Sequence, residues 1–107
     1  MSAPSSPMLE RLEAFLAKTP NDPFVRYGLA MELGRLGRTD EAIAAFRALV
    51  AGDPGYVPGY MQAGILLARV GRADEAREVL RTGIAAAARK GDGHALSEMQ
   101  GFLAELA

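Results

Sequence analysis

The sequence of 107 residues predicts an all-α fold made of repeated helix pairs. Good helix formers, above all Ala, Leu, Glu and Arg, dominate the chain, and β-branched residues are few. Apolar residues recur at intervals of three and four, which is the spacing of one helix face. The segment LGRLGRTDEA at residues 33–42 returns as LARVGRADEA at residues 67–76, 34 positions later. A period of this length is typical of stacked supersecondary units, so we expect about six helices arranged as antiparallel pairs.

The first predicted helix covers residues 7–19 and follows a loose N-terminus at residues 1–6. Ser6 can accept a hydrogen bond from a free N–H group of the first turn. Pro7 suits the first helical position because it has no N–H group to leave unpaired. The apolar residues that follow at helical spacing are Leu9, Leu12, Phe15 and Leu16. They share one face, which predicts an amphipathic helix.

The second and third helices form the first copy of the pair. The second opens with the same signal, Asp22 followed by Pro23, and ends at Gly37. Glycine takes the left-handed conformation that ends many helices. The third helix follows at once, and we expect Thr39 or Asp40 to cap it with a side-chain oxygen.

The second half of the chain repeats this order. A helix over about residues 56–70 ends at Gly71, and a longer helix over about residues 73–90 follows. The sequence GDG then interrupts the chain before a last helix over residues 93–106. These glycines and turn residues therefore predict three further helices.

Two sets of apolar residues, small residues and turn glycines match with the period of 34, although Pro54 corresponds to Ala88 and Tyr60 corresponds to Arg26. In the first copy they are Leu29, Ala30, Leu33, Gly37, Ala42, Phe46 and Pro54. In the second copy they are Tyr60, Ala63, Gly64, Leu67, Gly71, Ala76 and Leu80. In these residues the chain resembles the tetratricopeptide repeat family, as a small bacterial-type member of unassigned function. The resemblance implies that the antiparallel helix-turn-helix repeats stack as a short right-handed superhelix, with flanking helices at both ends.

The resemblance also implies a single domain over residues 7–107. Its full repeats would cover residues 23–54 and 57–90, with residues 7–19 as a half-repeat helix and residues 93–106 as a C-terminal capping helix.

Small residues are expected where the two helices of a repeat cross closely, since larger side chains there would force the helices apart. They are Ala30 and Gly64 on the first helices and Ala42 and Ala76 on the second. Leu49 and Gly83 replace an alanine that the family has late in the second helix.

Composition and motifs exclude several classes of function. The chain has no cysteine and a formal net charge of −1, which argues against a thiolate metal site and against a field that attracts nucleic acid. His94 is the one histidine, and no nucleophile set, metal-ligand set or Gly-rich phosphate loop surrounds it. We therefore expect no enzyme activity, cofactor or metal, and no binding to nucleic acid or membrane. The N-terminal sequence lacks a signal-peptide pattern, which indicates a cytoplasmic location.

Arginines fall in repeat-matched pairs, and two interpretations of them remain open. The pairs are Arg35 and Arg69, Arg38 and Arg72, and Arg47 and Arg81. They could form a basic strip for an acidic peptide, because arginine presents a planar fork to carboxylates. Alternatively, they could offset helix C-terminal dipoles and pair with nearby carboxylates of the chain.

The candidate binding residues lie on the first helix of each repeat, which lines the concave groove in the family that the chain resembles. They are Phe24, Tyr27, Met31, Arg35, Met61, Gln62, Ile65 and Arg69. The Lys/Asn set with which chaperone-binding members hold a terminal carboxylate is missing from these helices. The remaining apolar strip predicts an interaction module for a protein or peptide partner. The alternative is a self-associating scaffold protein, a weak homodimer formed through the groove or through the first helix.

Overall fold

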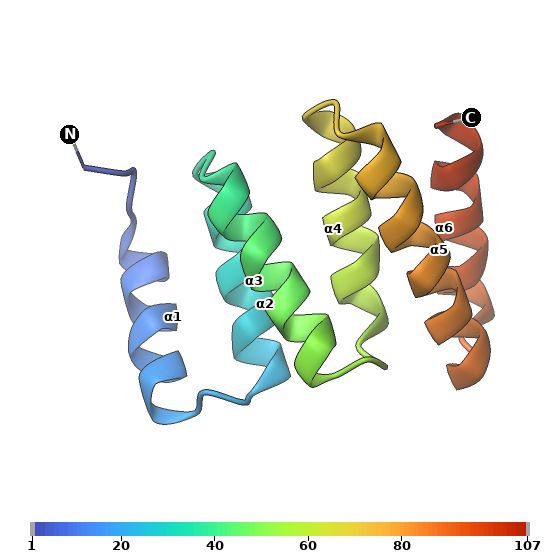
Figure 1. Ribbon diagram of the computed structural model, residues 1–107. Coiled ribbons are helices and arrows are strands. Elements are labelled where there is room, and N and C mark those ends of the chain that lie inside the picture. Colours follow the sequence, from blue (N-terminus) through green and yellow to red (C-terminus); the bar gives the residue numbers. More distant parts are fainter. Residues whose placement is uncertain (1, 107) are drawn as a thin grey trace. The chain divides into compact units, whose positions relative to one another are not determined.

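The computed structural model describes residues 2–106 and confirms an all-α fold of helix-turn-helix repeats (Figure 1). The helices are α1 (Pro7–Lys18), α2 (Pro23–Arg35), α3 (Thr39–Gly52), α4 (Val57–Arg69), α5 (Ala73–Lys90) and α6 (Gly93–Glu105). No strand occurs in the described residues. The chain divides into two compact units, residues 1–53 with α1 to α3 and residues 54–107 with α4 to α6. The single domain and the right-handed superhelix stay predictions.

In the first unit, α2 packs against both α1 and α3. Two predicted caps are confirmed. The Ser6 hydroxyl accepts a hydrogen bond from Leu9 N at 3.0 Å, and Asp22 Oδ1 accepts one from Phe24 N at 3.0 Å. Leu9, which belongs to the predicted stripe of α1, is buried.

The predicted cap of α3 is wrong, because Thr39 is already the first helical residue and Arg38 occupies the capping position without a side-chain cap. The reason is the turn itself. Gly37 adopts a φ of 77°, and Arg38 N then donates a hydrogen bond to Leu33 O at 2.9 Å. This closure of α2 leaves Arg38 as the last non-helical residue, so neither Thr39 nor Asp40 can serve as the cap.

The same turn recurs in the second unit, where Gly71 has a φ of 82° and Arg72 N donates to Leu67 O at 2.8 Å. The repeated ten-residue segment is therefore a turn between two helices, made twice with the same hydrogen bond. Here too the following helix starts without a side-chain cap.

In the second unit, two glycines allow neighbouring helices to pack closely. A Cβ atom at Gly64 on α4 would lie 2.6 Å from Leu80 Cδ2 on α5, which confirms the expected small position. A Cβ atom at Gly83 on α5 would lie 2.5 Å from Tyr60 Cβ and 2.7 Å from Met99 Sδ. Gly83 thus lies where α4, α5 and α6 meet.

Helix α6 packs against α5 and also contacts α4. Gly91 ends α5 with a φ of 71°, and Asp92 caps α6 by accepting a hydrogen bond from Ala95 N at 3.0 Å. Met99 is fully buried between these helices. Because α6 reaches α4, it contributes to the surface beside the first helix of the second repeat.

Candidate binding site

The predicted binding residues lie on α2 and α4, with four on each helix. The α2 set consists of Phe24, Tyr27, Met31 and Arg35, and the α4 set consists of Met61, Gln62, Ile65 and Arg69. Because the two helices belong to different units, each set is described by itself. Their combination into one binding surface stays a prediction.

On α2, two apolar side chains lie open to solvent. Phe24 is 75% exposed and Met31, two helical turns later, is 40% exposed. Tyr27 is half-buried, and its ring packs edge-on against that of Phe46 on α3, with 6.4 Å between the ring centroids. Tyr27 therefore supports the helix pair, while Phe24 and Met31 offer apolar surface.

Arg35, at the end of α2, is held by a carboxylate of its own helix. Its Nε donates to Glu32 Oε1 at 2.7 Å and its Nη2 donates to Glu32 Oε2 at 2.6 Å. Such a two-bond arrangement combines charge attraction with a fixed orientation. Glu32 is only 8% exposed, whereas the side chain of Arg35 is 65% exposed.

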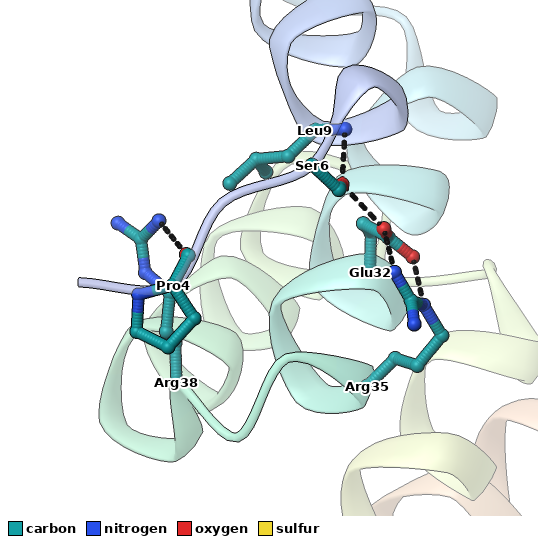
Figure 2. A network of polar contacts seen from close by, with 6 residues as sticks. All are labelled: Pro4, Ser6, Leu9, Glu32, Arg35 and Arg38. Carbon is teal, nitrogen blue, oxygen red and sulfur yellow. Dashed lines mark hydrogen bonds and ion pairs between the residues drawn. The ribbon is translucent and has the colours of Figure 1, made fainter.

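Glu32 also connects α2 to the start of α1 (Figure 2). The Ser6 hydroxyl donates to Glu32 Oε2 at 2.6 Å while it accepts the hydrogen bond from Leu9 N. Nearby, Arg38 Nη1 donates to the carbonyl oxygen of Pro4 at 2.9 Å. The N-terminal segment has no regular secondary structure, yet two of its residues contact α2 and the turn that follows it.

The hydrogen bonds from Arg35 and then Ser6 lower the pKa of the Glu32 carboxyl from its ordinary value of 4.5 to about 2. The same carboxylate raises the pKa of Arg35 above its already high value. The pair therefore stays ionised near neutral pH, and the chain itself neutralises Arg35. Sequence reasoning missed Glu32, although its spacing of three residues from Arg35 on a helix was a usable signal.

On α4, Met61, Gln62 and Ile65 are half-buried and Arg69 is exposed. Ile65 and Arg69 lie together at a pocket of about 330 Å³ within the second unit. We call it the α4–α6 pocket, and its lining comprises Gly64, Ile65, Ala68, Arg69, Leu80, Phe102, Glu105 and Leu106. Sequence reasoning did not include α6 in the site, because nothing in its apolar pattern says which helix it meets.

Arg69 differs from Arg35 in that no hydrogen bond or ion pair holds it among residues 2–106. The residue three positions before it is Leu66, which is buried, where the first repeat has Glu32. Arg69 therefore lines the α4–α6 pocket without a carboxylate partner in the described part of the chain.

Of the other repeat-matched arginines, Arg38 and Arg72 follow the local-pairing interpretation. Arg38 pairs with Glu41, and Arg72 Nη2 lies 2.8 Å from Glu75 Oε2. Both pairs join the residue before a helix to its first turn, and exposed pairs of this kind contribute little to stability. They belong to the turns rather than to a binding strip.

Two further findings bear on other functions. His94 is exposed, and its Nε2 lies 2.7 Å from Glu98 Oε1 one turn further along α6. Among residues 2–106, no helix combines the length and the apolar character needed to cross a bilayer.

Comparison with known proteins gives consistent matches. A family model described as tetratricopeptide repeat matches residues 35–99, and a second with the same description matches residues 9–57. The TPR repeat-containing protein PA0015 of Pseudomonas aeruginosa is 33% identical over 99 residues, covering 92% of this chain and 94% of that protein.

Solved structures agree with these matches. A tetratricopeptide repeat domain protein from Salinibacter ruber is 38% identical with a TM-score of 0.76, covering 81% of this chain and 88% of that one. Protein BPP2914 from Bordetella parapertussis is 31% identical with a TM-score of 0.80, and the match covers 95% of this chain and 89% of that one. The TPR2B domain of yeast Sti1, solved as a complex with pHsp70, shares the fold, with a TM-score of 0.85 at 20% identity. The match covers 92% of this chain and 78% of that one.

Proposed function

Because this chain belongs to the tetratricopeptide repeat family, a fold of protein-interaction modules, we propose that it binds a protein or peptide partner through the first helices of its repeats. The observation that carries the proposal is apolar surface left open on these helices. Phe24 and Met31 on α2 are exposed, and Ile65 on α4 borders the α4–α6 pocket. Exposed apolar patches rimmed by polar residues typically mark interaction sites.

The partner would place apolar side chains against these residues, as a helix or as an extended segment. Met31 and Met61 suit this role because methionine side chains are flexible and polarisable, so they adapt to different partners. The complex of the Sti1 domain with pHsp70 supports a partner-binding role for this fold. Binding of this kind requires neither a cofactor nor a metal.

The proposal is tested by placing charge on the binding face. In the double variant Met31→Glu with Ile65→Glu, a bound partner would have to bury two carboxylates, which is unfavourable without compensating partners. We expect affinity-purified chain to retain its partners from a lysate at roughly one tenth of the wild-type level or less.

A matched control is Ala44→Glu with Ala85→Glu, which adds the same charge at exposed positions of α3 and α5. Circular dichroism establishes that both double variants are folded. Equal partner recovery from the two double variants would contradict the proposal.

A second candidate function is self-association through α1. Met8 is 49% exposed and Phe15, two turns later on the same face, is 59% exposed. These side chains give α1 an apolar outer face in addition to its packing face. Light scattering at high concentration decides this candidate, because a wild-type monomer would eliminate it, whereas a dimer that Phe15→Glu dissociates would establish it.

A further inference from the structure

Helix α1 corresponds in register to the second helices of the two repeats. It ends at Lys18, and α3 ends at Gly52, 34 residues later. The helices that follow them, α2 and α4, also begin 34 residues apart. In the complete repeats, α3 packs against α2 and α5 packs against α4, whereas α1 in the first unit packs only against α2, the helix that follows it (Figure 1). Helix α1 is therefore a second helix that has no first helix of its own within residues 2–106.

Two large apolar side chains on α1 are exposed at positions that the first complete repeat buries. Met8 is 49% exposed, and its counterpart on α3, Ala42, is 0% exposed. Phe15 is 59% exposed, and its counterpart, Leu49, is 1% exposed. Met8 and Phe15 lie two helical turns apart on one face, so together they form an uncovered apolar surface. This surface is the face that a second helix turns towards its own repeat.

The second repeat shows what kind of element covers this face. Gly83 on α5 is the counterpart of Phe15, and a Cβ atom there would lie 2.5 Å from Tyr60 Cβ on α4. The element that covers the position is thus a helix, the first one of the same repeat. Phe15 projects further than a glycine or a leucine, so a helix that covers α1 has to receive its ring in a groove between side chains. Small residues opposite Phe15 would provide that groove.

The charges on α1 indicate what else such a helix carries. Arg11 follows Met8 by three residues, a spacing that places them side by side on the helix. Lys18 follows Phe15 by the same interval. The two cations therefore line one edge of the apolar surface. Both are exposed, and neither makes a hydrogen bond or an ion pair within residues 2–106. Acidic side chains along the facing edge of a partner helix would complement them.

We propose that the exposed face of α1 binds an amphipathic helix of a partner protein, which takes the place of the absent first helix and completes a repeat. The apolar side of this helix carries small residues opposite Phe15, and one edge carries carboxylates that pair with Arg11 and Lys18. The surface does not include the binding residues on α2 and α4, so the inference goes beyond the proposed function. A second copy of α1 suits the face less well, because a two-fold axis would set the two basic edges side by side.

The test uses three synthetic helices of 13 residues, the length of α2 and α4. Each has a row of Ala and Leu on one side and a side-chain staple, because an isolated helix of this length is only marginally stable in water. The three differ along one edge, which carries Glu, Gln or Lys. Fluorescence anisotropy measures the affinity of each labelled helix for the full chain.

We expect the wild type to bind the Glu helix about fivefold to tenfold more tightly than the Gln helix, since two ion pairs at a partly covered edge contribute about this much. The Lys helix should bind most weakly. Arg11→Gln with Lys18→Gln should abolish the preference for Glu. Arg89→Gln with Lys90→Gln is the matched control, because it removes two exposed positive charges from the last turn of α5 and should leave the preference intact.

Phe15→Glu should weaken the binding of all three helices by about tenfold or more, because it places a carboxylate within the apolar contact. Ala44→Glu, at an exposed position of α3, adds the same charge away from this face and should leave binding unchanged. Circular dichroism establishes that the variants are folded.

The remaining outcomes separate the inference from the proposed function. Equal binding of the three helices, a preference that survives Arg11→Gln with Lys18→Gln, or no binding to the wild type overturns the inference. If Phe24→Glu abolishes binding and Phe15→Glu does not, the helix occupies the first helices of the repeats, which overturns the inference and supports the proposed function. A wild-type dimer that Phe15→Glu dissociates would show that a second copy covers α1, and the inference would then be wrong.

Discussion

The first repeat, residues 23–54, and the second repeat, residues 57–90, share a turn but differ in what surrounds it. Both turns place a glycine at positive φ and close with a hydrogen bond from the next arginine N–H group. Beyond the turn, Glu32 in the first repeat corresponds to buried Leu66 in the second, and Leu49 corresponds to Gly83. The two repeats thus share the turn between their helices and differ at the neighbouring positions, where each unit packs its own third helix.

The third helix of each unit accounts for Glu32 in the first repeat and for Gly83 in the second. In the first unit, α1 approaches α2 with a polar N-terminal cap, and Ser6 requires an acceptor, which Glu32 provides at 2.6 Å. In the second unit, α6 packs against α5 with Met99, and Gly83 leaves room for its sulfur atom. Both third helices combine apolar packing with hydrogen bonds, but only the first unit has the polar network at Glu32 and only the second has the close approach at Gly83. Substitutions at these contacts should therefore act on the two units in different ways.

The largest loss of stability is expected for Gly83→Ala, because the added Cβ atom would overlap Tyr60 Cβ and Met99 Sδ. We expect the free energy of unfolding to fall by about 2–3 kcal/mol, measured by urea denaturation. Gly101→Ala on exposed α6 surface is the control, since nothing lies within 4 Å of the added atom. It should leave stability unchanged or raise it by about 0.5–1 kcal/mol. Equal destabilisation by both substitutions would refute the close packing at Gly83.

A smaller effect is expected for Ser6→Ala in the first unit, since α1 loses its cap and Glu32 loses one donor. The free energy of unfolding should fall by about 1 kcal/mol in the same measurement. Ser97→Ala, at an exposed position inside α6, removes a hydroxyl without removing a cap and should be neutral or slightly stabilising. If Ser6→Ala were also neutral, the link between α1 and α2 would not contribute to stability.

The smallest change in stability is expected for Glu32→Gln, and its pH dependence should appear only at acid pH. The pKa of Glu32 is lowered to about 2 in the folded chain from an ordinary value of 4.5, so the unfolded chain binds the proton first as pH falls. The stabilisation is therefore complete above about pH 5 and declines as pH falls from 4.5 towards 2. Thermal unfolding of Glu32→Gln should show a shallower loss of stability over this range than the wild type. Exposed Glu78→Gln should retain the wild-type slope, and an unchanged slope in Glu32→Gln would contradict the assignment.

Much of the secondary structure could be predicted because its causes are local. Ser6 and Asp22 cap their helices through bonds to residues two or three positions away, and Gly37 and Gly71 end theirs through backbone conformation. The cap predicted at Thr39 or Asp40 failed for a reason that is also local. A helix that follows such a turn directly starts one residue earlier than its side chains suggest, because the turn has already determined the backbone at Arg38.

The candidate site was less predictable because its properties depend on distant neighbours. The period assigned Arg35 and Arg69 to equivalent positions, and both do end the first helix of a repeat. The sequence did not show that Arg35 is neutralised within a network that reaches Ser6, since that contact spans 26 residues. Nor did it show that α6 would supply Phe102 and Leu106 to a pocket beside Arg69.

The sequence by itself therefore determined the helices, the turns between them and the family, because caps, glycines and apolar periodicity act over a few residues. Only the tertiary structure decided which arginine a carboxylate holds within residues 2–106, and that an apolar pocket adjoins the other one. The physical reason is that charge neutralisation and pocket shape arise from side chains brought together by helix packing, and the choice of neighbouring helix is not encoded in any single segment.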